Sequence, residues 1–307
     1  MCLYSLTREE RYLDAALRAG RFLRRAWNAR LGVFPFEYSE GEADSDGFAY
    51  FFDSGIIVRG LLRLWRITGG REWIEAAKAC GRSMRQDFAA GDSEYHPILR
   101  LPGKEPAPRS PQWSRTPGCY QLKAALGWLE LHKDTGESDY LDWYEDLLAA
   151  SLRTRESFLG CASGDAVMDR LHAYCYFLEG ILPRVERPEV AAALADGIAT
   201  VAGQMTAVGP GFVRSDVCAQ LLRLQLLAGR AGIGANRLAA LSLVEKIEAF
   251  QLSSPDLRIH GGFFFARRGG QLQPHVNPVS TAFGLQALLM WRQYLAGELL
   301  FAPDMVI

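Results

Sequence analysis

The chain has 307 residues, of which 49% are apolar, with 34 basic and 35 acidic side chains. This length allows one large domain or two ordinary ones with a sizeable core. The near-zero net charge argues against a general affinity for nucleic acid or for an anionic membrane.

The N-terminal sequence and the positions of the cysteines indicate the cellular location and the kind of cysteine chemistry. The opening MCLYSLTREERYLD lacks the apolar core of a secretion signal, and no uninterrupted apolar stretch reaches the roughly 20 residues of a membrane helix. The six cysteines stand apart, without CxxC pairs, which favours buried free thiols over disulfides or a structural zinc site. We therefore expect a cytoplasmic protein with no metal site and no cofactor.

The first predicted helices are of two kinds. Residues 8–28 carry apolar side chains such as Tyr12, Ala19 and Ala26 at spacings that place them on one stripe. Residues 48–68 are apolar around most of the circumference and end at a Thr-Gly-Gly stop. Residues 71–88 return to the one-striped kind.

The alternation continues along the chain. Apolar helices are expected over 118–136, 171–185, 216–229 and 278–295, and amphipathic ones from near Asp139 and over 188–205 and 236–251. A helix that is apolar around its whole circumference must be packed on both sides, whereas an amphipathic helix with one apolar stripe must be packed on one side only. Two concentric rings of helices meet both needs. The uneven spacing disfavours a regular solenoid, and no linker divides residues 1–307, so a single domain is predicted.

The hairpin RGLLRLWRITGGREWIEAA, residues 59–77, resembles those of the six-hairpin glycosidase superfamily. That group includes unsaturated glucuronyl hydrolases, with N-acylglucosamine 2-epimerases and (α/α)-toroid polysaccharide lyases nearby. The resemblance covers nearly the whole chain as a pattern, without a family-defining catalytic motif. It implies an all-α fold, an (α/α) toroid of about five to six helical hairpins. Because an inner helix before Arg8 is lacking, we expect an incomplete ring.

In such a ring, the long loops that enter the inner helices gather at one end of the axis. These insertions are 29–47, 89–117, 159–169, 207–215 and 252–277, and they mix aromatic with charged residues. Flat rings cover sugar faces while charged groups bind hydroxyls, so we expect a sugar site there. The predicted substrate-binding residues, including two at the starts of inner helices, are Phe34, Glu37, Tyr38, Tyr95, His96, Trp113, Tyr120, Arg214, His275 and Asn277.

Four residues near the starts of inner helices are the predicted catalytic group: Asp53, Asp169, His172 and Asp216. Asp169 and His172 are three residues apart, which places them on one helical face. Asp53 stands among apolar residues, which raise a carboxyl pKa.

Structural alternatives stand beside these roles. Asp53 and Asp169 are also candidate helix caps, and His172 a candidate hydrogen-bond donor to a neighbouring helix. Glu179, within an apolar helix, is expected to pair with an arginine such as Arg59. HGGFFFARRGG, residues 260–270, lacks the setting of a phosphate loop and is interpreted as a β-hairpin or a lid.

Three functions remain open. The first is a glycoside hydrolase acting on an oligosaccharide, including one that contains uronic acid, with Asp53 as acid and Asp169 or Asp216 as base. The second is a sugar epimerase or polysaccharide lyase with a histidine or tyrosine base. The third is a non-catalytic toroid that binds carbohydrate or protein. The expected partner is an oligosaccharide or another small molecule; the sequence does not specify the oligomeric state.

Overall fold

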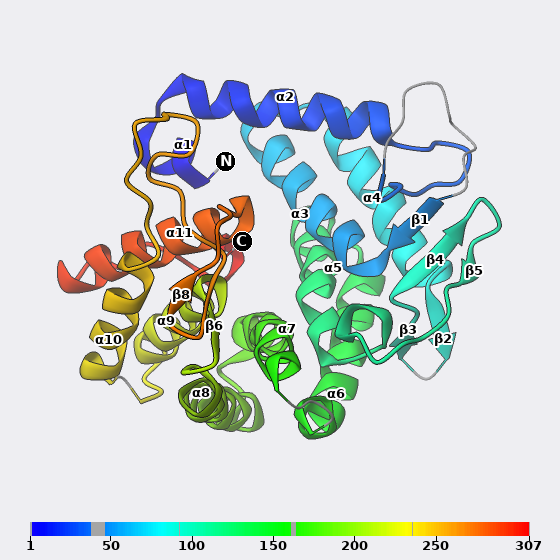
Figure 1. Ribbon diagram of the computed structural model, residues 1–307. Helices are drawn as coiled ribbons and strands as arrows, with labels where there is room; N and C mark the ends of the chain where they lie inside the picture. The colour runs from blue at the N-terminus through cyan, green and yellow to red at the C-terminus, as the bar shows by residue number, and fades with distance from the viewer. Residues whose placement is uncertain (1, 38–46, 92, 161–163, 235, 307) are drawn as a thin grey trace. The chain divides into compact units, whose positions relative to one another are not determined.

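The computed structural model describes residues 2–37, 47–91, 93–160, 164–234 and 236–306, and the chain divides into two compact units, Met1–Arg153 and Thr154–Ile307 (Figure 1). Helices dominate both units. They alternate between richly buried and one-sided types along the chain.

Unit 1 is built around two buried helices, α3 (Phe51–Thr68) and α5 (Leu122–Thr135). The other helices are α1 (Cys2–Thr7), α2 (Glu10–Ala26), α4 (Arg71–Gln86) and the start of α6 (Ser138–Leu159). α3 packs against α2, α4 and α5. A short helix, α1, precedes Arg8, where the sequence predicted that an inner helix is lacking.

α3 and α5 approach each other closely because small residues face each other. A Cβ atom added to Gly55 would lie 2.3 Å from the Ala124 carbonyl oxygen, and one added to Gly127 would lie 3.1 Å from the Gly55 carbonyl oxygen. Both helices end at a left-handed glycine, Gly69 with φ 69° and Gly136 with φ 75°. A glycine in this conformation carries no Cβ penalty, so the two Gly stops act as predicted.

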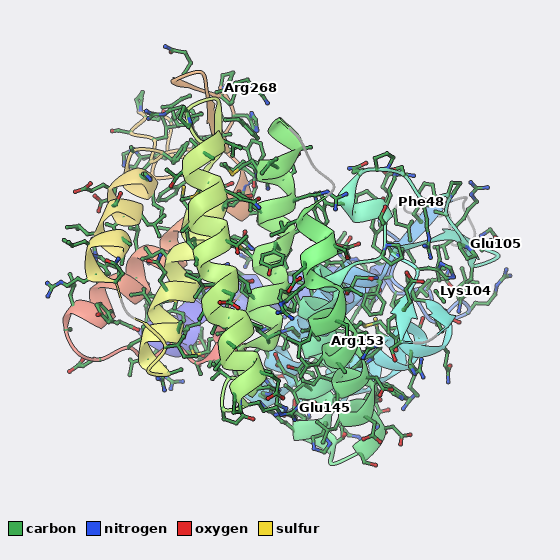
Figure 2. All side chains as sticks on the ribbon, turned by 90° about the horizontal axis from the view of Figure 1, so that it is seen from below. Phe48, Lys104, Glu105, Glu145, Arg153 and Arg268 are labelled. Carbon is green, nitrogen blue, oxygen red and sulfur yellow. The ribbon has the colours of Figure 1, made fainter. Side chains whose placement is uncertain are left out.

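Short strands organise the loops of unit 1. β1 (Gly47–Tyr50) pairs with β4 (Ile98–Leu101), which pairs with β5 (Glu105–Pro106), and β2 (Ala89–Gly91) pairs with β3 (Glu94–Tyr95). Lys104, at the turn before β5, is bound at 2.6 Å by Asp87 next to the end of α4 (Figure 2). The sequence predicted helix from residue 48, but residues 47–50 are a strand that leads into α3.

Unit 2 is centred on α9 (Ser215–Arg230), which is buried along most of its length. It packs against α7 (Asp165–Ile181), α8 (Pro188–Val208), α10 (Arg237–Glu248) and α11 (Pro278–Leu295). α7 begins six residues before the predicted start at residue 171, inside the predicted loop 159–169.

A small sheet introduces α9. β6 (Phe212–Arg214) pairs with β7 (Ala266–Arg268), which pairs with β8 (Gln271–Leu272). The predicted hairpin over 260–270 is therefore present, shifted to 266–272. Arg268 lies on its exposed tip, with its guanidinium 4.4 Å from the Phe212 ring centroid (Figure 2).

A buried ion pair links the inner helices of unit 2. Arg223 Nη2 donates to Glu179 Oε1 at 2.6 Å, and Nη1 donates to Gln286 Oε1 at 2.7 Å. Glu179 thus pairs with an arginine, as expected, and this arginine is Arg223. Arg59 binds Glu130 of α5 at 2.8 Å, because α5 is the neighbour that α3 packs against in unit 1.

Two other sequence patterns are resolved by the structure. Cys80, Cys119, Cys175 and Cys218 are buried free thiols, as predicted for these four. Among the described residues, α8 alone has the length and composition of a membrane span. Such a single helix is weak support for a membrane role, since α8 packs against α7 and α9 as a core helix does.

Candidate active site

Four predicted site residues of unit 2 meet in one cluster, the Arg214 cluster: Asp169, His172, Arg214, Asp216 and, in addition, Gln220. α7 carries Asp169 and His172 on one face, as their spacing predicted. Arg214 ends β6, and Asp216 and Gln220 lie one turn apart in α9.

The β6–α9 junction that carries Arg214 is held by the neighbouring strand. Arg214 pairs with Ala266 of β7 and keeps an extended backbone, and α9 begins at the next residue. The Ser215 hydroxyl donates to the Phe264 carbonyl at 2.7 Å, and the Ser215 N–H donates to the Phe265 carbonyl at 3.0 Å. The sheet thus fixes the direction in which Arg214 and Asp216 leave the backbone.

Arg214 binds two carboxylates at once. Its Nε and Nη2 donate to the two oxygens of Asp216 at 2.9 and 2.6 Å, and Nη1 donates to Asp169 Oδ1 at 2.6 Å. The Asp216 side chain is only 3% exposed, whereas that of Asp169 is 47% exposed. Asp169 is not the N-cap of its helix, because α7 begins at Asp165, four residues before Asp169.

The charges settle the ionisation state of Asp216. Burial acts to raise its pKa, but the charge of His172 when that ring is protonated, the charge of Arg214, and hydrogen bonds from Arg214 and the Val217 N–H lower the pKa below its ordinary value. Asp216 is therefore an ionised, bidentate partner of Arg214. A carboxylate held in this way is a poor proton donor near neutral pH.

His172 is buried and lies between Gln220 and Asp216. Its Nδ1 is 2.8 Å from Gln220 Oε1 and 3.7 Å from Asp216 Oδ2. Burial lowers the pKa of His172; Asp216, a hydrogen bond to Gln220 and Glu179 oppose this shift, and Arg214 adds to it. The imidazole is thus neutral at neutral pH and able to accept a proton.

Aromatic rings border the Arg214 cluster. The Arg214 guanidinium carbon lies 4.7 Å from the Phe265 ring centroid, and Phe265 stacks on His275 at 5.1 Å. The ring of Tyr176 meets that of His172 edge to face at 4.6 Å. His275 is exposed, beside the cluster that the sequence predicted it would join.

Asn277 has a local structural role. Its side-chain oxygen accepts hydrogen bonds from the N–H groups of Val279 and Ser280, so it is the N-cap of α11. Its role in binding substrate stays a prediction.

In unit 1, Asp53 lies in the first turn of α3. Helix α3 begins at Phe51 after Tyr50, so Asp53 is not its N-cap, and the Tyr50 side chain makes no cap bond to the described backbone there. Burial raises the pKa of the Asp53 carboxyl, as its apolar neighbours predicted.

The aromatic residues predicted to bind substrate in unit 1 are packed against neighbouring rings, and their role in binding substrate stays a prediction. Phe34 is buried against Trp27, and Tyr95 stacks on Phe51 at 4.9 Å. Tyr120 is buried; its hydroxyl donates to the Thr116 carbonyl at 3.2 Å, and its ring meets Trp113 at 5.0 Å.

The remaining predicted residues of unit 1 lie nearer the surface. Glu37 is exposed, while Trp113 and His96 are half-buried; the backbone N–H of His96 donates to the Phe88 carbonyl. Tyr38 falls outside the described residues.

Gln220 is the member of the cluster that sequence reasoning missed. It lies four residues after Asp216, the spacing of neighbours on a helical face, and a polar amide in an all-round apolar helix was the available signal. Among the described residues, no group of three or more histidines, cysteines, aspartates or glutamates is placed to hold a metal ion.

No protein-family model and no curated protein matches the sequence. Solved structures do match. A D-mannose isomerase matches with a TM-score of 0.68 and 12% identity over 94% of this chain and 83% of its own. Cellobiose 2-epimerase from Spirochaeta thermophila DSM 6192 matches with a TM-score of 0.66 and 12% identity, over 95% of this chain and 83% of its own. Cellobiose 2-epimerase from Bacillus thermoamylovorans B4167 matches with a TM-score of 0.69 and 12% identity, over 93% of this chain and 83% of its own.

These similarities show the fold. The chain has the (α/α) toroid fold of these structures, so the predicted fold class is confirmed, and the resemblance is confirmed as one of fold.

Proposed function

We propose that this protein is a sugar isomerase or epimerase that uses His172 to move a proton on the carbon next to a carbonyl group. One observation carries the proposal: His172 is a buried histidine with a lowered pKa, and a partner within 2.8 Å fixes its Nδ1. A neutral imidazole with one nitrogen held is the arrangement of a general base.

The carboxylates of the cluster support this choice over glycoside hydrolysis. A hydrolase needs one protonated and one ionised carboxyl group that flank the bond. Asp169 and Asp216 instead share the guanidinium of Arg214, and the pKa of Asp216 is lowered. Within unit 2, the histidine is therefore the better proton acceptor.

The chemistry begins with an open-chain aldose. His172 takes the proton from C2, and the electrons of that C–H bond form the C1=C2 double bond of an enediol while the carbonyl oxygen gains a proton from solvent. Return of the proton to C1, while O2 loses its proton to solvent and C2=O forms, gives a ketose, which needs only one base. Protonation of C2 on the opposite face, while O1 loses its proton to solvent and C1=O forms again, gives the epimer, which needs a second proton donor.

The charge of the cluster favours a neutral sugar. Two carboxylates face one guanidinium, and all three nitrogens of Arg214 already donate to Asp169 or Asp216. A uronate carboxylate would have to displace one of these bonds. The half-exposed carboxylate of Asp169 is instead suited to accept hydrogen bonds from sugar hydroxyls.

The fold agrees with this function, since the similar structures are those of a D-mannose isomerase and two cellobiose 2-epimerases. Carbohydrate activity, an oligosaccharide or monosaccharide partner and a cytoplasmic location are all part of the proposal. The four buried free thiols are consistent with a reducing compartment.

The test is incubation with D-mannose, D-fructose, D-glucose or cellobiose in deuterated water, followed by proton NMR. Deuterium at C2 or C1 of a converted sugar is the expected product. His172→Gln should abolish conversion, whereas His260→Gln should retain it; the His260 ring lies within hydrogen-bonding distance of Ser254, outside the cluster. No exchange into any of these sugars would overturn the proposal.

A second candidate is the glycoside hydrolase with Asp53 as acid. The observation that favours it is the raised pKa of Asp53, which keeps a carboxyl protonated to higher pH. Release of reducing ends from neutral or uronic-acid oligosaccharides, lost in Asp53→Asn and retained in His172→Gln, would select this function instead.

Ligand binding without turnover would point to the third possibility, a non-catalytic toroid. A ligand at 100 times its Kd adds about 2.7 kcal/mol of stability, which a thermal-unfolding screen detects. Binding that survives both His172→Gln and Asp53→Asn, with no product from any sugar, would support that function.

A further inference from the structure

The side-chain amide of Gln220 contacts His172 twice. Gln220 is fully buried in α9, and its amide reaches across to His172 on the neighbouring helix α7. Gln220 Oε1 lies 2.8 Å from His172 Nδ1, and Gln220 Nε2 donates to the backbone carbonyl of His172 at 3.4 Å. Since the amide carries no charge, this contact acts on His172 by orienting the ring and selecting its tautomer.

The second contact fixes which end of the amide faces the ring. An amide nitrogen has only donors and an amide oxygen only lone pairs. Because the His172 carbonyl accepts from Nε2, the oxygen of Gln220 is left for Nδ1. Nδ1 must then carry the proton, and the lone pair of the neutral imidazole stands on Nε2.

Asp216 is the other acceptor near His172 Nδ1, and its pairing with Arg214 keeps it from accepting that proton. Asp216 Oδ2 lies 3.7 Å from His172 Nδ1, beyond hydrogen-bonding distance, while Arg214 Nη2 lies 2.6 Å from the same oxygen. Without this pairing, the carboxylate would be free to accept from Nδ1 directly. Such a contact would favour the charged imidazolium.

We infer that Gln220 is the positioning residue that fixes the Nε2 lone pair of His172, and that Arg214 keeps Asp216 from taking this role. The role of this lone pair in proton transfer rests on the proposed function. The assignment of the His172 tautomer rests only on the hydrogen bonds to Gln220. Pairing with the neutral amide of Gln220, instead of with the Asp216 carboxylate, favours the neutral form of His172 over the imidazolium.

Charged groups of unit 2 lie near His172 on its own helix, on β6 and on α9. Asp169 and Glu179 lie on its own helix, Arg214 on β6, and Asp216 on α9; α11 contributes the ring of Phe283, at 6.4 Å. Replacing the neutral amide of Gln220 with a carboxylate would therefore change the local charge balance by a full unit.

The first experiment is nitrogen-15 NMR of the imidazole of His172 in the wild-type protein. The proton should reside on Nδ1 at neutral pH. A proton on Nε2, or a mixture of tautomers, would overturn the inference without any variant. This measurement needs no substrate, so it stands apart from a failure of the proposed function.

Variants then test the role. Gln220→Glu should raise the pH at which His172 titrates by about 1 unit or more, because an opposite charge favours the imidazolium. The acid limb of the pH profile of kcat/KM should move upward with it. Unchanged titration in Gln220→Glu would contradict the inference.

Gln220→Leu should give a mixed tautomer and lower kcat by on the order of 100-fold with KM nearly unchanged. Gln225→Leu is the matched control: it lies in the same helix, and its Oε1 has no hydrogen-bond partner among the described residues. It should leave the titration, the tautomer and kcat as in the wild type. Equal losses in Gln220→Leu and Gln225→Leu would indicate a merely structural effect and overturn the inference.

If Gln220→Leu does not fold, Gln220→Asn replaces it, since the amide is retained one methylene shorter. It should shift the tautomer toward Nε2–H. A protein that keeps the Nδ1 proton in the wild type but converts no sugar would preserve this inference and refute the proposed function.

Discussion

Asp53 illustrates how burial acts on a single carboxyl group. Its pKa is raised by burial at the start of α3, so the folded state binds the proton more tightly than the unfolded chain does. That contribution to stability is fully present below the unfolded pKa of about 3.8 and is lost as the pH rises through the folded pKa. At neutral pH the burial of Asp53 is therefore a net cost to stability.

From this sign, Asp53→Asn is predicted to raise the melting temperature at pH 7. The gain should shrink as the pH falls and vanish below about pH 4, where both states of the wild type are protonated. Asp256→Asn is a suitable contrast, because hydrogen bonds from Arg258 lower the pKa of Asp256. Its effect should have the opposite sign. A gain from Asp53→Asn that persisted at about pH 3 would contradict this explanation.

The buried pair of Arg223 and Glu179 leads to a second prediction. Both side chains are 0% exposed, so removal of one charge leaves the other in an apolar interior. Arg223→Met should lower the free energy of unfolding by about 3–5 kcal/mol in urea titrations.

Two further variants test the cause of that loss. Arg223→Met combined with Glu179→Gln should recover part of it, because the unpaired charge is removed. Arg258→Met, which breaks an exposed pair with Asp256, should lower the urea midpoint far less than Arg223→Met does. A loss in Arg223→Met no larger than in Arg258→Met would show that the buried pair contributes little.

At the residue scale, the spacing of residues along a helix predicted which of them share a face, but not which helix packs against that face. Asp169 and His172 were placed on one face because helical geometry requires it, and Arg214 and Asp216 proved to face them. The sequence predicted an arginine partner for Glu179 but did not indicate Arg223, because a helical pattern does not state which helix lies opposite. Arg223 comes 44 positions later, in the adjacent α9.

At the element scale, the contact of α3 with α5 depends on residues without side chains. A Cβ on Gly55 would lie 2.3 Å from a backbone oxygen of α5, which cannot rotate away. Gly60, in the same helix, has none of the described atoms within 4 Å of the corresponding position. These two glycines of one helix are therefore predicted to respond oppositely to the same substitution.

Gly55→Ala should force α3 and α5 apart and cost about 1–3 kcal/mol of unfolding free energy. Gly60→Ala should add about 0.5–1 kcal/mol, since alanine is the better residue in an exposed helix interior. Both are measured by chemical denaturation. Destabilisation by Gly60→Ala, or tolerance of Gly55→Ala, would contradict the close approach of these helices.

The helix boundaries show what local sequence can and cannot indicate. The ends of α3 and α5 were predicted because a glycine in left-handed geometry stops a helix. The start of α7 was missed because no capping side chain marks it; its N-cap is Gly164. Strand β1 was interpreted as helix because its pairing partner, β4, lies about 50 residues further along the chain.

At the scale of the whole molecule, alternation was the strongest signal. A helix that is buried all round and a helix with one stripe need different amounts of cover, and that need alone predicts two concentric rings of helices. The function was harder to predict because one fold hosts many functions, which depend on the particular residues of each site.

The prediction of a single domain over residues 1–307 can be tested by the distribution of tryptophans. Six of the seven lie within residues 1–153, and Trp291 is the only one in unit 2, so fluorescence reports chiefly on unit 1. Far-UV circular dichroism reports on helices of both units. If the chain unfolds as one domain, the two urea transitions should coincide.

Trp291→Phe sharpens this comparison, because it confines the tryptophan signal to unit 1 while an aromatic ring remains to stack on Tyr294. Coincident fluorescence and dichroism midpoints in this variant would mean that the buried inner helices of each unit depend on the other unit for stability. A second dichroism step without a fluorescence change would mean that unit 2, with the Arg214 cluster, folds on its own core. The single-domain prediction would then be wrong, and the cluster could be studied in the isolated unit.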